Sequence, residues 1–332
     1  MSDLVSVVLP VGPGARGALE ALEDLKRQSW RELEIIAVLN GCPKEIREAY
    51  QMESSSRLRL IDHGDTPNLL KALSSAIDAS SGKWLARMDT DDRCHPERVE
   101  KTLQPLLRGE CDVASCGIEL IDPIGQGMQR YVDWVNGLTD QAQLSRERFI
   151  ESPVVQPTVI MSKELFLEAG GYLDDGFAED YSLWLRLLAL RKRFGKVTER
   201  LYSWRDHEER LTRNDDRFSQ KKMLALKAQA LSQLPDVQER GVTFCGAGPI
   251  AKVLARELLA REITVLGFFE IDPKRIGSIC QGKPIADYRE LGSRWRSGVQ
   301  LSAVGTPGGR DVIREAARKS GFKEGCNFWC CC

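Results

Sequence analysis

The sequence predicts an α/β fold in which a doubly wound, mainly parallel sheet is followed by a small second α/β domain. Apolar, β-branched runs alternate with amphipathic helical segments over the first hundred residues, which is typical of parallel βαβ units. The chain has 332 residues, and at roughly 150 residues per domain this length indicates about two domains. Because a new strand begins after Gly241, we expect domains at residues 1–235 and 236–332.

Each element of the first domain follows from its own pattern. Runs such as LVSVVLPV and LEIIAVL are continuous and β-branched, as buried strands are, and segments with apolar residues three or four apart are helices. Residues 122–152 are less regular, 154–161 regain an apolar pattern, and a charged helical segment at 213–235 closes the domain. The expected strands are 4–11, 33–39, 57–62, 84–88 and 112–121, and the expected helices are 16–28, 44–52, 68–80 and 96–107.

Composition narrows the class of protein. Lys plus Arg number 47 and Asp plus Glu 48, so a net charge of −1 offers no basic surface for nucleic acid. No window reaches the roughly 18 to 20 apolar residues that cross a bilayer, and the N-terminus lacks the basic region of a signal peptide. The ten cysteines show no metal-ligand spacing. We therefore expect reduced thiols and a cytoplasmic protein.

The motif Asp89-Thr90-Asp91-Asp92 directly follows the strand at 84–88, at the sheet edge where ligands of such folds bind. Carboxylates held together raise one another's pKa, and Mg²⁺ or Mn²⁺ would relieve this repulsion and bring a diphosphate with it. The alternative is an acidic start to the helix at 96–107, since carboxylates favour that end of a helix. The motif alone leaves both interpretations open.

A second acidic pair, Glu179-Asp180, opens an amphipathic helix whose apolar face includes Leu183, Trp184 and Leu187. A helix anchored in this way would hold one carboxylate rigidly toward a cleft, as a general base requires. Acids that only stabilise the helix N-terminus are the alternative.

The order of the motifs resembles the family 2 glycosyltransferases of GT-A fold over about residues 4–213. The resemblance rests on VSVVLPV, EIIAVLNG, GKWLARMDTDD with PERVE, ESPVVQPTVIM, AGGY with AEDYSLWLRL, and Trp204-Arg205-Asp206-His207. It implies an inverting enzyme that moves a sugar from a nucleoside diphosphate sugar to an acceptor hydroxyl in glycan or polysaccharide biosynthesis.

The resemblance also implies roles for single residues. Asp180 would be the general base, and Glu179 would orient it or bind acceptor hydroxyls. Asp91 would hold Mn²⁺ or Mg²⁺, Asp89 would meet the cation or the donor ribose, and Asp92 competes for the metal role. His207 would be a third metal ligand or a diphosphate contact, unless it is a surface histidine. The expected donor contacts are Pro10, Val11, Asn40, Asp89 and Thr90.

Two departures from the family pattern affect the donor. Val38-Leu39-Asn40-Gly41-Cys42 stands where an Asp usually follows the second strand, and Pro10-Val11-Gly12-Pro13 replaces the usual turn after the first. The nucleotide therefore stays open, and the alternative function is a catalytically inactive nucleotide-sugar-binding or scaffold protein.

The acceptor, a glycan or a lipid-linked one, is expected at residues 122–157. There Tyr131 and Trp134 either stack on a sugar or pack in the core. Peripheral membrane association and a homodimer both stay open.

The second domain begins with the strand 242–245 and the sequence Cys245-Gly246-Ala247-Gly248-Pro249-Ile250-Ala251. This G-x-G-x-x-A pattern brings the backbone close to a phosphate at a helix N-terminus, and Glu270 follows the next strand at the position of a ribose-binding acid. The domain resembles small Rossmann-type domains of sugar-modifying acyltransferases and CoA-binding proteins. It is too short for a full dinucleotide fold, so we expect a bound nucleotide or a structural, dimerising role. The final Cys330-Cys331-Cys332 is expected to be an unmodified thiol tail rather than a lipidated one.

Overall fold

The computed structural model describes residues 3–306 and 308–332 and divides into two compact units. The first unit comprises the chain up to Leu144, Val154–Asp175 and Glu179–Asn214, and the second comprises Ser145–Pro153, Gly176–Ala178 and Asp215–Cys332. The division therefore falls after Asn214 and not after residue 235. Its cause is helix α10 (Gln220–Ser232), which packs on α12 (Pro249–Leu259) within the second unit.

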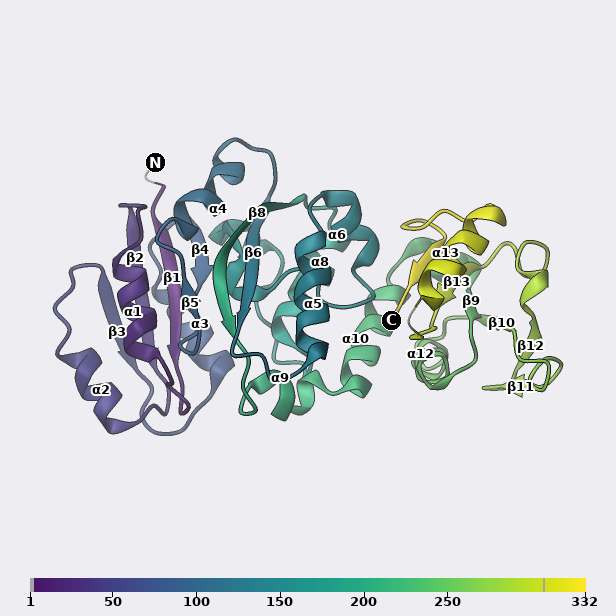
Figure 1. The fold of residues 1–332 in the computed structure, drawn as a ribbon, viewed down its shortest axis with the longest axis horizontal. Coiled ribbons are helices and arrows are strands. Elements are labelled where there is room, and N and C mark those ends of the chain that lie inside the picture. Colours follow the sequence, from purple (N-terminus) through teal and green to yellow (C-terminus); the bar gives the residue numbers. More distant parts are fainter. Residues whose placement is uncertain (1–2, 307) are drawn as a thin grey trace. The chain divides into compact units, whose positions relative to one another are not determined.

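The first unit is built on a mixed sheet whose strands run mostly parallel, which confirms the predicted α/β class (Figure 1). Within the described residues it has eight strands in the order β3-β2-β1-β4-β7-β6-β8-β5. β7 is antiparallel to both β4 and β6, and β5 is antiparallel to β8. The strands are β1 (Val5–Val11), β2 (Leu33–Leu39), β3 (Leu58–Asp62), β4 (Trp84–Arg87), β5 (Arg93–Cys94), β6 (Val113–Ile121), β7 (Ile160–Ser162) and β8 (Phe194–Arg205).

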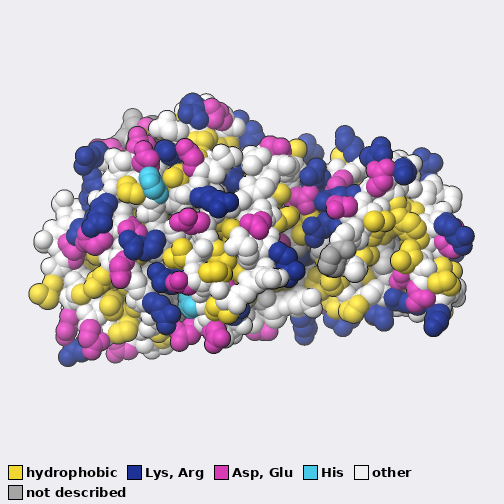
Figure 2. Space-filling view, viewed as in Figure 1, with side chains coloured by type: hydrophobic (Ala, Val, Ile, Leu, Met, Phe, Trp, Pro, Cys, Tyr) yellow, Lys and Arg dark blue, Asp and Glu magenta, His cyan; other side chains and the backbone are white. Residues whose placement is uncertain are grey.

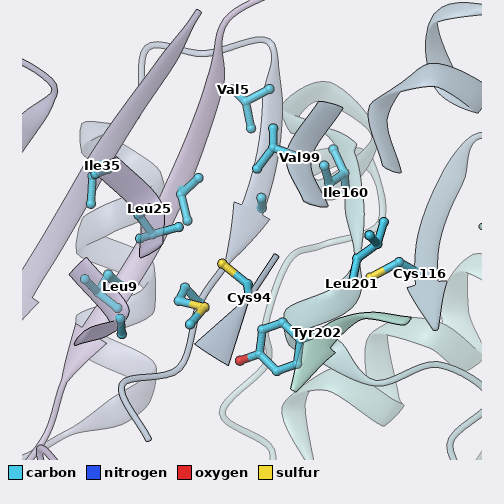
Figure 3. Packing of buried hydrophobic residues seen from close by; sticks show 14 of the residues in the cluster. Val5, Leu9, Leu25, Ile35, Cys94, Val99, Cys116, Ile160, Leu201 and Tyr202 are labelled. Atoms are coloured by element: carbon cyan, nitrogen blue, oxygen red, sulfur yellow. The ribbon is translucent and has the colours of Figure 1, made fainter. Parts of the chain in front are cut away.

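Complete burial of β1 explains why the first strands could be predicted. β1 pairs in parallel with β2 and β4, so that Val7 lies opposite both Ile35 and Ala86. Alternate side chains of β1 enter different clusters: Leu9 belongs to the core cluster in Figure 3, whereas Val8 belongs to the cluster on the other face. Strands that are buried on both faces are nearly continuous apolar runs, and this is the pattern in the sequence.

The four predicted helices of the first hundred residues are all present, each shortened by one or two residues at one or both ends. α3 begins where the side chain of Asn68 accepts the backbone N–H of Lys71 at 3.0 Å, an ordinary N-cap. The helices and helical turns up to residue 218 are α1 (Ala18–Lys26), α2 (Lys44–Gln51), α3 (Leu69–Ala79), α4 (Arg98–Leu107), α5 (Gln126–Gly137), α6 (Gln141–Glu147), η1 (Gln156–Thr158), α7 (Lys163–Glu168), α8 (Glu179–Ala189), α9 (Leu211–Asn214) and η2 (Asp216–Phe218).

Three regions differ from the prediction. Residues 122–152, expected to be irregular, contain α5 and α6. The apolar run at 154–161 is divided between η1 and β7. Strand β8 was not expected at all, because exposed polar residues at 198–200 interrupt its apolar pattern while its last third, Leu201–Arg205, is largely buried.

The second unit has a smaller sheet, whose described strands follow the order β11-β12-β10-β9-β13-β14 and are parallel apart from β11. The strand at 242–245 was predicted with its observed bounds. Figure 2 shows Lys and Arg side chains interspersed with Asp and Glu over the visible face, in line with the net charge of −1. The remaining elements are α11 (Pro235–Arg240), β9 (Val242–Cys245), β10 (Val265–Glu270), β11 (Ile279–Cys280), β12 (Lys283–Asp287), η3 (Tyr288–Glu290), β13 (Val299–Ser302), α13 (Gly309–Lys319) and β14 (Phe328–Cys330).

Candidate active site

The carboxyl ends of β1, β2 and β4 lie at one edge of the sheet, and the expected donor contacts are located there. Pro10 and Val11 are buried in β1. Asn40 is also buried, and its side-chain oxygen accepts the backbone N–H of Asn68 at 2.8 Å. Asn40 therefore fixes the start of α3, and its contact with a donor stays a prediction.

Asp89 is bound by an arginine from its own strand. Nε of Arg87 donates to Oδ1 of Asp89 at 2.7 Å, and the backbone N–H of Asp89 donates to the hydroxyl of Tyr202 at 3.4 Å. Burial raises the pKa of Asp89, and the Arg87 guanidinium only partly offsets this effect. The neighbouring Thr90 is buried, so its side chain is held within the loop.

Asp91 meets His207, the last residue of the Trp204–His207 segment. Oδ2 of Asp91 lies 2.8 Å from Nε2 of His207. The histidine side chain is 16% exposed, and its Nδ1 has no hydrogen-bond partner among the described residues. His207 is therefore not a surface histidine, and the structure brings it together with the motif's second aspartate.

Asp92 is fully buried and anchors the loop. The Tyr202 hydroxyl donates to one carboxylate oxygen and the backbone N–H of Arg205 to the other, each at 2.8 Å. Burial and the adjacent Asp91 raise the pKa of Asp92 well above its usual range. With both oxygens engaged by the protein, Asp92 is a poorer candidate for a metal ligand than Asp91.

Glu179 and Asp180 begin α8, and Arg87 links them to the first acidic motif. Nη1 of Arg87 lies 3.6 Å from Oε1 of Glu179, whose side chain is 4% exposed. Asp180 is half-buried, and its Oδ1 accepts the backbone N–H of Tyr181 at 2.7 Å. Burial and then the Glu179 carboxylate raise the pKa of Asp180 to about 7. The two acidic groups thus share one guanidinium.

The sequence reasoning gave no role to Arg87, Tyr202 or Arg205. Arg87 and Arg205 lie in segments that carried the resemblance, but their own contacts were not foreseen. Tyr202 carried no signal, because it contacts the motif only through β8, where Nε of Arg205 also donates to the carbonyl of Asp91 at 2.9 Å. The loop is therefore held by residues more than a hundred positions away.

Asp91 and His207 are the residues of the site that could hold a divalent cation. Their Oδ2 and Nε2 atoms contact each other at 2.8 Å, so a cation would take the place of this contact, and the described residues contain no group of three or more His, Cys, Asp or Glu that could hold a metal. Mg²⁺ is commonly held by one or two carboxylates together with substrate phosphates and water, so a site of few protein ligands agrees with that ion. Asp89 lies in the same loop but is engaged by Arg87.

Residues 6–168, which include the aspartate motif, match the family model described as Glycosyl transferase family 2. The chain contains a family 2 glycosyltransferase domain. This domain, together with similarity to named glycosyltransferases, supports a glycosyltransferase enzyme. The chain is 24% identical over 212 residues to the O-antigen biosynthesis glycosyltransferase WbnJ of Escherichia coli, covering 62% of this chain and 80% of WbnJ.

A second relative is the amylovoran biosynthesis glycosyltransferase AmsE of Erwinia amylovora, 30% identical over 173 residues. The aligned part is 52% of this chain and 64% of AmsE, so the glycosyltransferase spans just under two thirds of that relative. Among solved structures, TarS 1–349 of S. aureus matches with a TM-score of 0.54 and 17% identity, over 78% of this chain and 71% of that one. This likeness shows the GT-A fold.

Two aromatic residues expected near the acceptor pack inside the glycosyltransferase. The ring of Tyr131 lies 5.7 Å from that of Trp134 and 5.9 Å from that of Trp204, and Tyr131 and Trp134 both pack against the main core cluster. The packing alternative therefore holds for them. No helix of the described residues is long and apolar enough to span a membrane.

The expected nucleotide motif of the second unit forms a turn between β9 and α12. Gly246 has a φ of +87°, and Gly248 is the N-cap of α12. Glu270 receives Nη1 of Arg275 at 2.9 Å and the backbone N–H of Ala247 at 3.3 Å, so protein groups already satisfy this acid. Cys330 and Cys331 are buried, and their lack of modification stays a prediction.

Proposed function

We propose that the chain is an inverting glycosyltransferase, which transfers a sugar from a nucleoside diphosphate sugar to an acceptor hydroxyl in the biosynthesis of a glycan or polysaccharide. The biosynthetic roles named for WbnJ and AmsE support the class of product. The observation that carries the proposal is the shared contact of Arg87 with Asp89 and Glu179, which brings the donor-side acids and the base-bearing helix to one place.

Asp180 is proposed as the general base. Its pKa of about 7 leaves a substantial carboxylate population at neutral pH while keeping it basic enough to accept a proton. The oxygen of the acceptor hydroxyl attacks the anomeric carbon and gives its proton to Asp180. The bond from the anomeric carbon to the nucleoside diphosphate breaks on the opposite face. Glu179, held by Arg87, then serves to orient the base or an acceptor hydroxyl.

Asp91 and His207 are proposed to hold Mn²⁺ or Mg²⁺, with Asp89 beside them as a further ligand or a ribose contact. When bound, such an ion neutralises negative charge on the diphosphate leaving group. The protein's own part is to keep these two donors facing each other, which it does through the contacts of Tyr202 and Arg205 with the loop.

Release of nucleoside diphosphate with Mn²⁺ present, measured over a panel of nucleotide sugars and acceptors, tests the proposal. We expect turnover with at least one donor, and Asp180→Asn should lower it by about 100- to 10,000-fold, the usual contribution of a general base, while donor affinity stays nearly unchanged. An Asp180→Asn protein with the wild-type rate would remove Asp180 from the role of base. Absence of turnover with every donor would favour a binding or scaffold role.

For the second unit we propose nucleotide binding at Gly246–Gly248, with Glu270 facing the ribose. The positive φ of Gly246 and the open space around a Cβ built on Gly248 support a close backbone approach. Since Arg275 occupies Glu270, a ligand would have to displace it or bind beside it. Calorimetric titration of the full chain and of Gly248→Val with nucleotides checks this; equal binding by both would contradict the site. A cytoplasmic location, peripheral membrane association and a homodimer stay as further proposals.

A further inference from the structure

Arg87 contacts both acidic groups, and the reaction scheme uses it only to hold Glu179. It ends β4, whereas Glu179 begins α8, so the two are remote in sequence. Its Nε lies 2.7 Å from Asp89 Oδ1 and its Nη1 3.6 Å from Glu179 Oε1. We propose that Arg87 is a positioning residue for sugar transfer, which holds the donor-side carboxylate and the base-bearing helix at a fixed separation. The inference rests on the proposed function.

The chemistry of arginine suits this task. A guanidinium is planar and presents donors in fixed directions, so one side chain can bind two carboxylates at once in a defined geometry. A lysine ammonium is a point charge on a flexible stem and defines no such separation. Nε of Arg87 donates to Asp89, and Nη1 lies within ion-pair range of Glu179, so one guanidinium stands between the two acids.

The backbone of Arg87 is itself held in place. Nη1 of the fully buried Arg98 donates to the carbonyl of Arg87 at 3.2 Å and to the carbonyl of Pro157 at 2.5 Å. This ties the end of β4 to η1 beneath the site. The backbone position of Arg87 is therefore fixed, and its side chain extends from there to the two acids.

The side chain has little room to leave the acids. It is 11% exposed, and toward the interior it borders a cavity of about 20 Å³ that Gln156 and Tyr172 also line. That volume admits about one water molecule and no guanidinium. Arg87 thus stays between Asp89 and Glu179.

Replacing Arg87 with a neutral residue would leave the Asp89 and Glu179 carboxylates without their cationic partner. Glu179 is 4% exposed and Asp89 21%, and burial of a charge without its partner is strongly unfavourable. The first turn of α8 would then shift, and Asp180 with it, because Asp180 follows Glu179 directly. A displacement of about 1 Å in a reacting group costs on the order of 100-fold in rate. The expected defect is therefore in turnover, not in donor binding.

The test compares Arg87→Met and Arg87→Lys with Arg193→Met as matched control. Arg193 also pairs with an aspartate in the first unit, Asp112 at 3.0 Å, but is half exposed and has no role in the site. We expect Arg87→Met to lower kcat by about 100-fold with the donor KM changed less than about threefold, and Arg87→Lys to recover about a tenth of the wild-type rate. Arg193→Met should match the wild type.

A second readout does not depend on activity. Amide hydrogen exchange of residues 179–183 should be faster in Arg87→Met than in Arg193→Met, because the first turn of α8 loses its anchor. If Arg87→Met does not fold, Arg87→Lys carries both measurements.

Wild-type kcat in the Arg87 variants would overturn the inference. A raised donor KM with unchanged kcat would overturn it too, since Arg87 would then be a donor ligand. A wild-type protein without turnover would contradict the proposed function alone. The exchange rates would in that case decide whether Arg87 anchors α8, and equal rates in Arg87→Met and Arg193→Met would reject it.

Discussion

Asp180 and Glu179 are neighbours in sequence but have different surroundings. Glu179 is almost fully buried and paired with Arg87. Asp180 is half-buried and accepts the backbone N–H of Tyr181, the next residue of the same helix. Burial and the Glu179 charge favour the neutral form of Asp180. The two adjacent carboxyl groups thus have different surroundings, and a carboxyl group with a raised pKa is suited to take a proton.

The pH dependence of transfer follows from the raised pKa of Asp180. The base is active only when deprotonated, so kcat/KM should fall below about pH 7, to about one tenth of its plateau at pH 6. Glu179→Gln removes a charge that raises this pKa and should move the midpoint to lower pH. Initial rates at subsaturating acceptor between pH 5 and 9 measure it. A flat profile over this range would contradict the assignment of Asp180 as base.

Asp91→Ala tests the metal pair. It removes one of the two proposed metal ligands, so the Mn²⁺-dependent affinity for the nucleotide sugar should fall at least about tenfold. A loss of this size is typical even of residues that only hydrogen-bond to a metal ligand. Donor binding with a chelator present should change little. Calorimetric titrations with Mn²⁺ and with EDTA measure both, and Asp112→Asn, remote from the site, is the control. A loss of the same size with EDTA would mean that Asp91 binds the donor directly.

At the scale of elements, the loop between β4 and β5 owes its shape to β8. β5 pairs with β8 at Cys94 and Tyr202, and the Tyr202 hydroxyl reaches back to Asp92. Figure 3 shows Tyr202 and Cys94 close together in the core of this region. A strand from late in the domain therefore sets the conformation of a loop near its middle.

Tyr202→Phe tests this dependence. It keeps the ring but leaves the buried Asp92 carboxyl without its hydroxyl partner, so stability should fall by about 1–3 kcal/mol, the cost of leaving a buried polar group unsatisfied, and kcat should fall as well. Tyr50→Phe removes a buried hydroxyl that donates to the Ala18 carbonyl at 2.6 Å, away from the acids. It should cost about 0.5–1.5 kcal/mol with no change in kcat. Urea unfolding and initial rates measure both, and equal kinetic effects would reject the role of β8.

What could be predicted at this scale depended on local pattern. β1 and β2 were predicted because each is continuously apolar, and α8 because Leu183, Trp184 and Leu187 share a face. β8 could not be predicted, since exposed polar residues interrupt it and its pairing with β6 and β5 involves segments far away in sequence. The acidic residues were recognisable by type, but the contacts of Arg87, Tyr202 and Arg205 exist only in three dimensions.

At the scale of the whole molecule, each unit has a core of its own. A substitution in one core should therefore destabilise that unit. A Cβ at Gly267 would lie 2.2 Å from the Trp295 ring, which also packs on Phe269 at 5.2 Å. Gly267→Ala should therefore destabilise the second unit by about 1–3 kcal/mol through overpacking. Gly305→Ala, where the nearest atoms stand at 3.7 Å or more, is the control. Hydrogen exchange of β9 and β10 measures the effect, and unchanged protection in Gly267→Ala would contradict it.

The domain boundary predicted at residue 235 was placed by turn residues alone, whereas the two compact units divide after Asn214. Pro235 and Gly241 do mark a break in secondary structure, but α10 before them packs on α12 after them. The sequence of α10 does not show which helix it packs against. The sequences of residues 145–153 and 176–178 do not show either that these stretches belong to the second unit.

The contacts of residues 145–153 have a consequence for folding during synthesis. The ring of Phe149 packs at 5.1 Å from that of Trp329, and Lys227 donates through Nζ to the carbonyl of Ile150 at 2.7 Å. During vectorial synthesis on a ribosome, residues 145–153 would emerge long before these partners exist. This segment therefore stays unpacked until Lys227 and Trp329 have been translated, and a truncation after residue 214 would leave it without these partners.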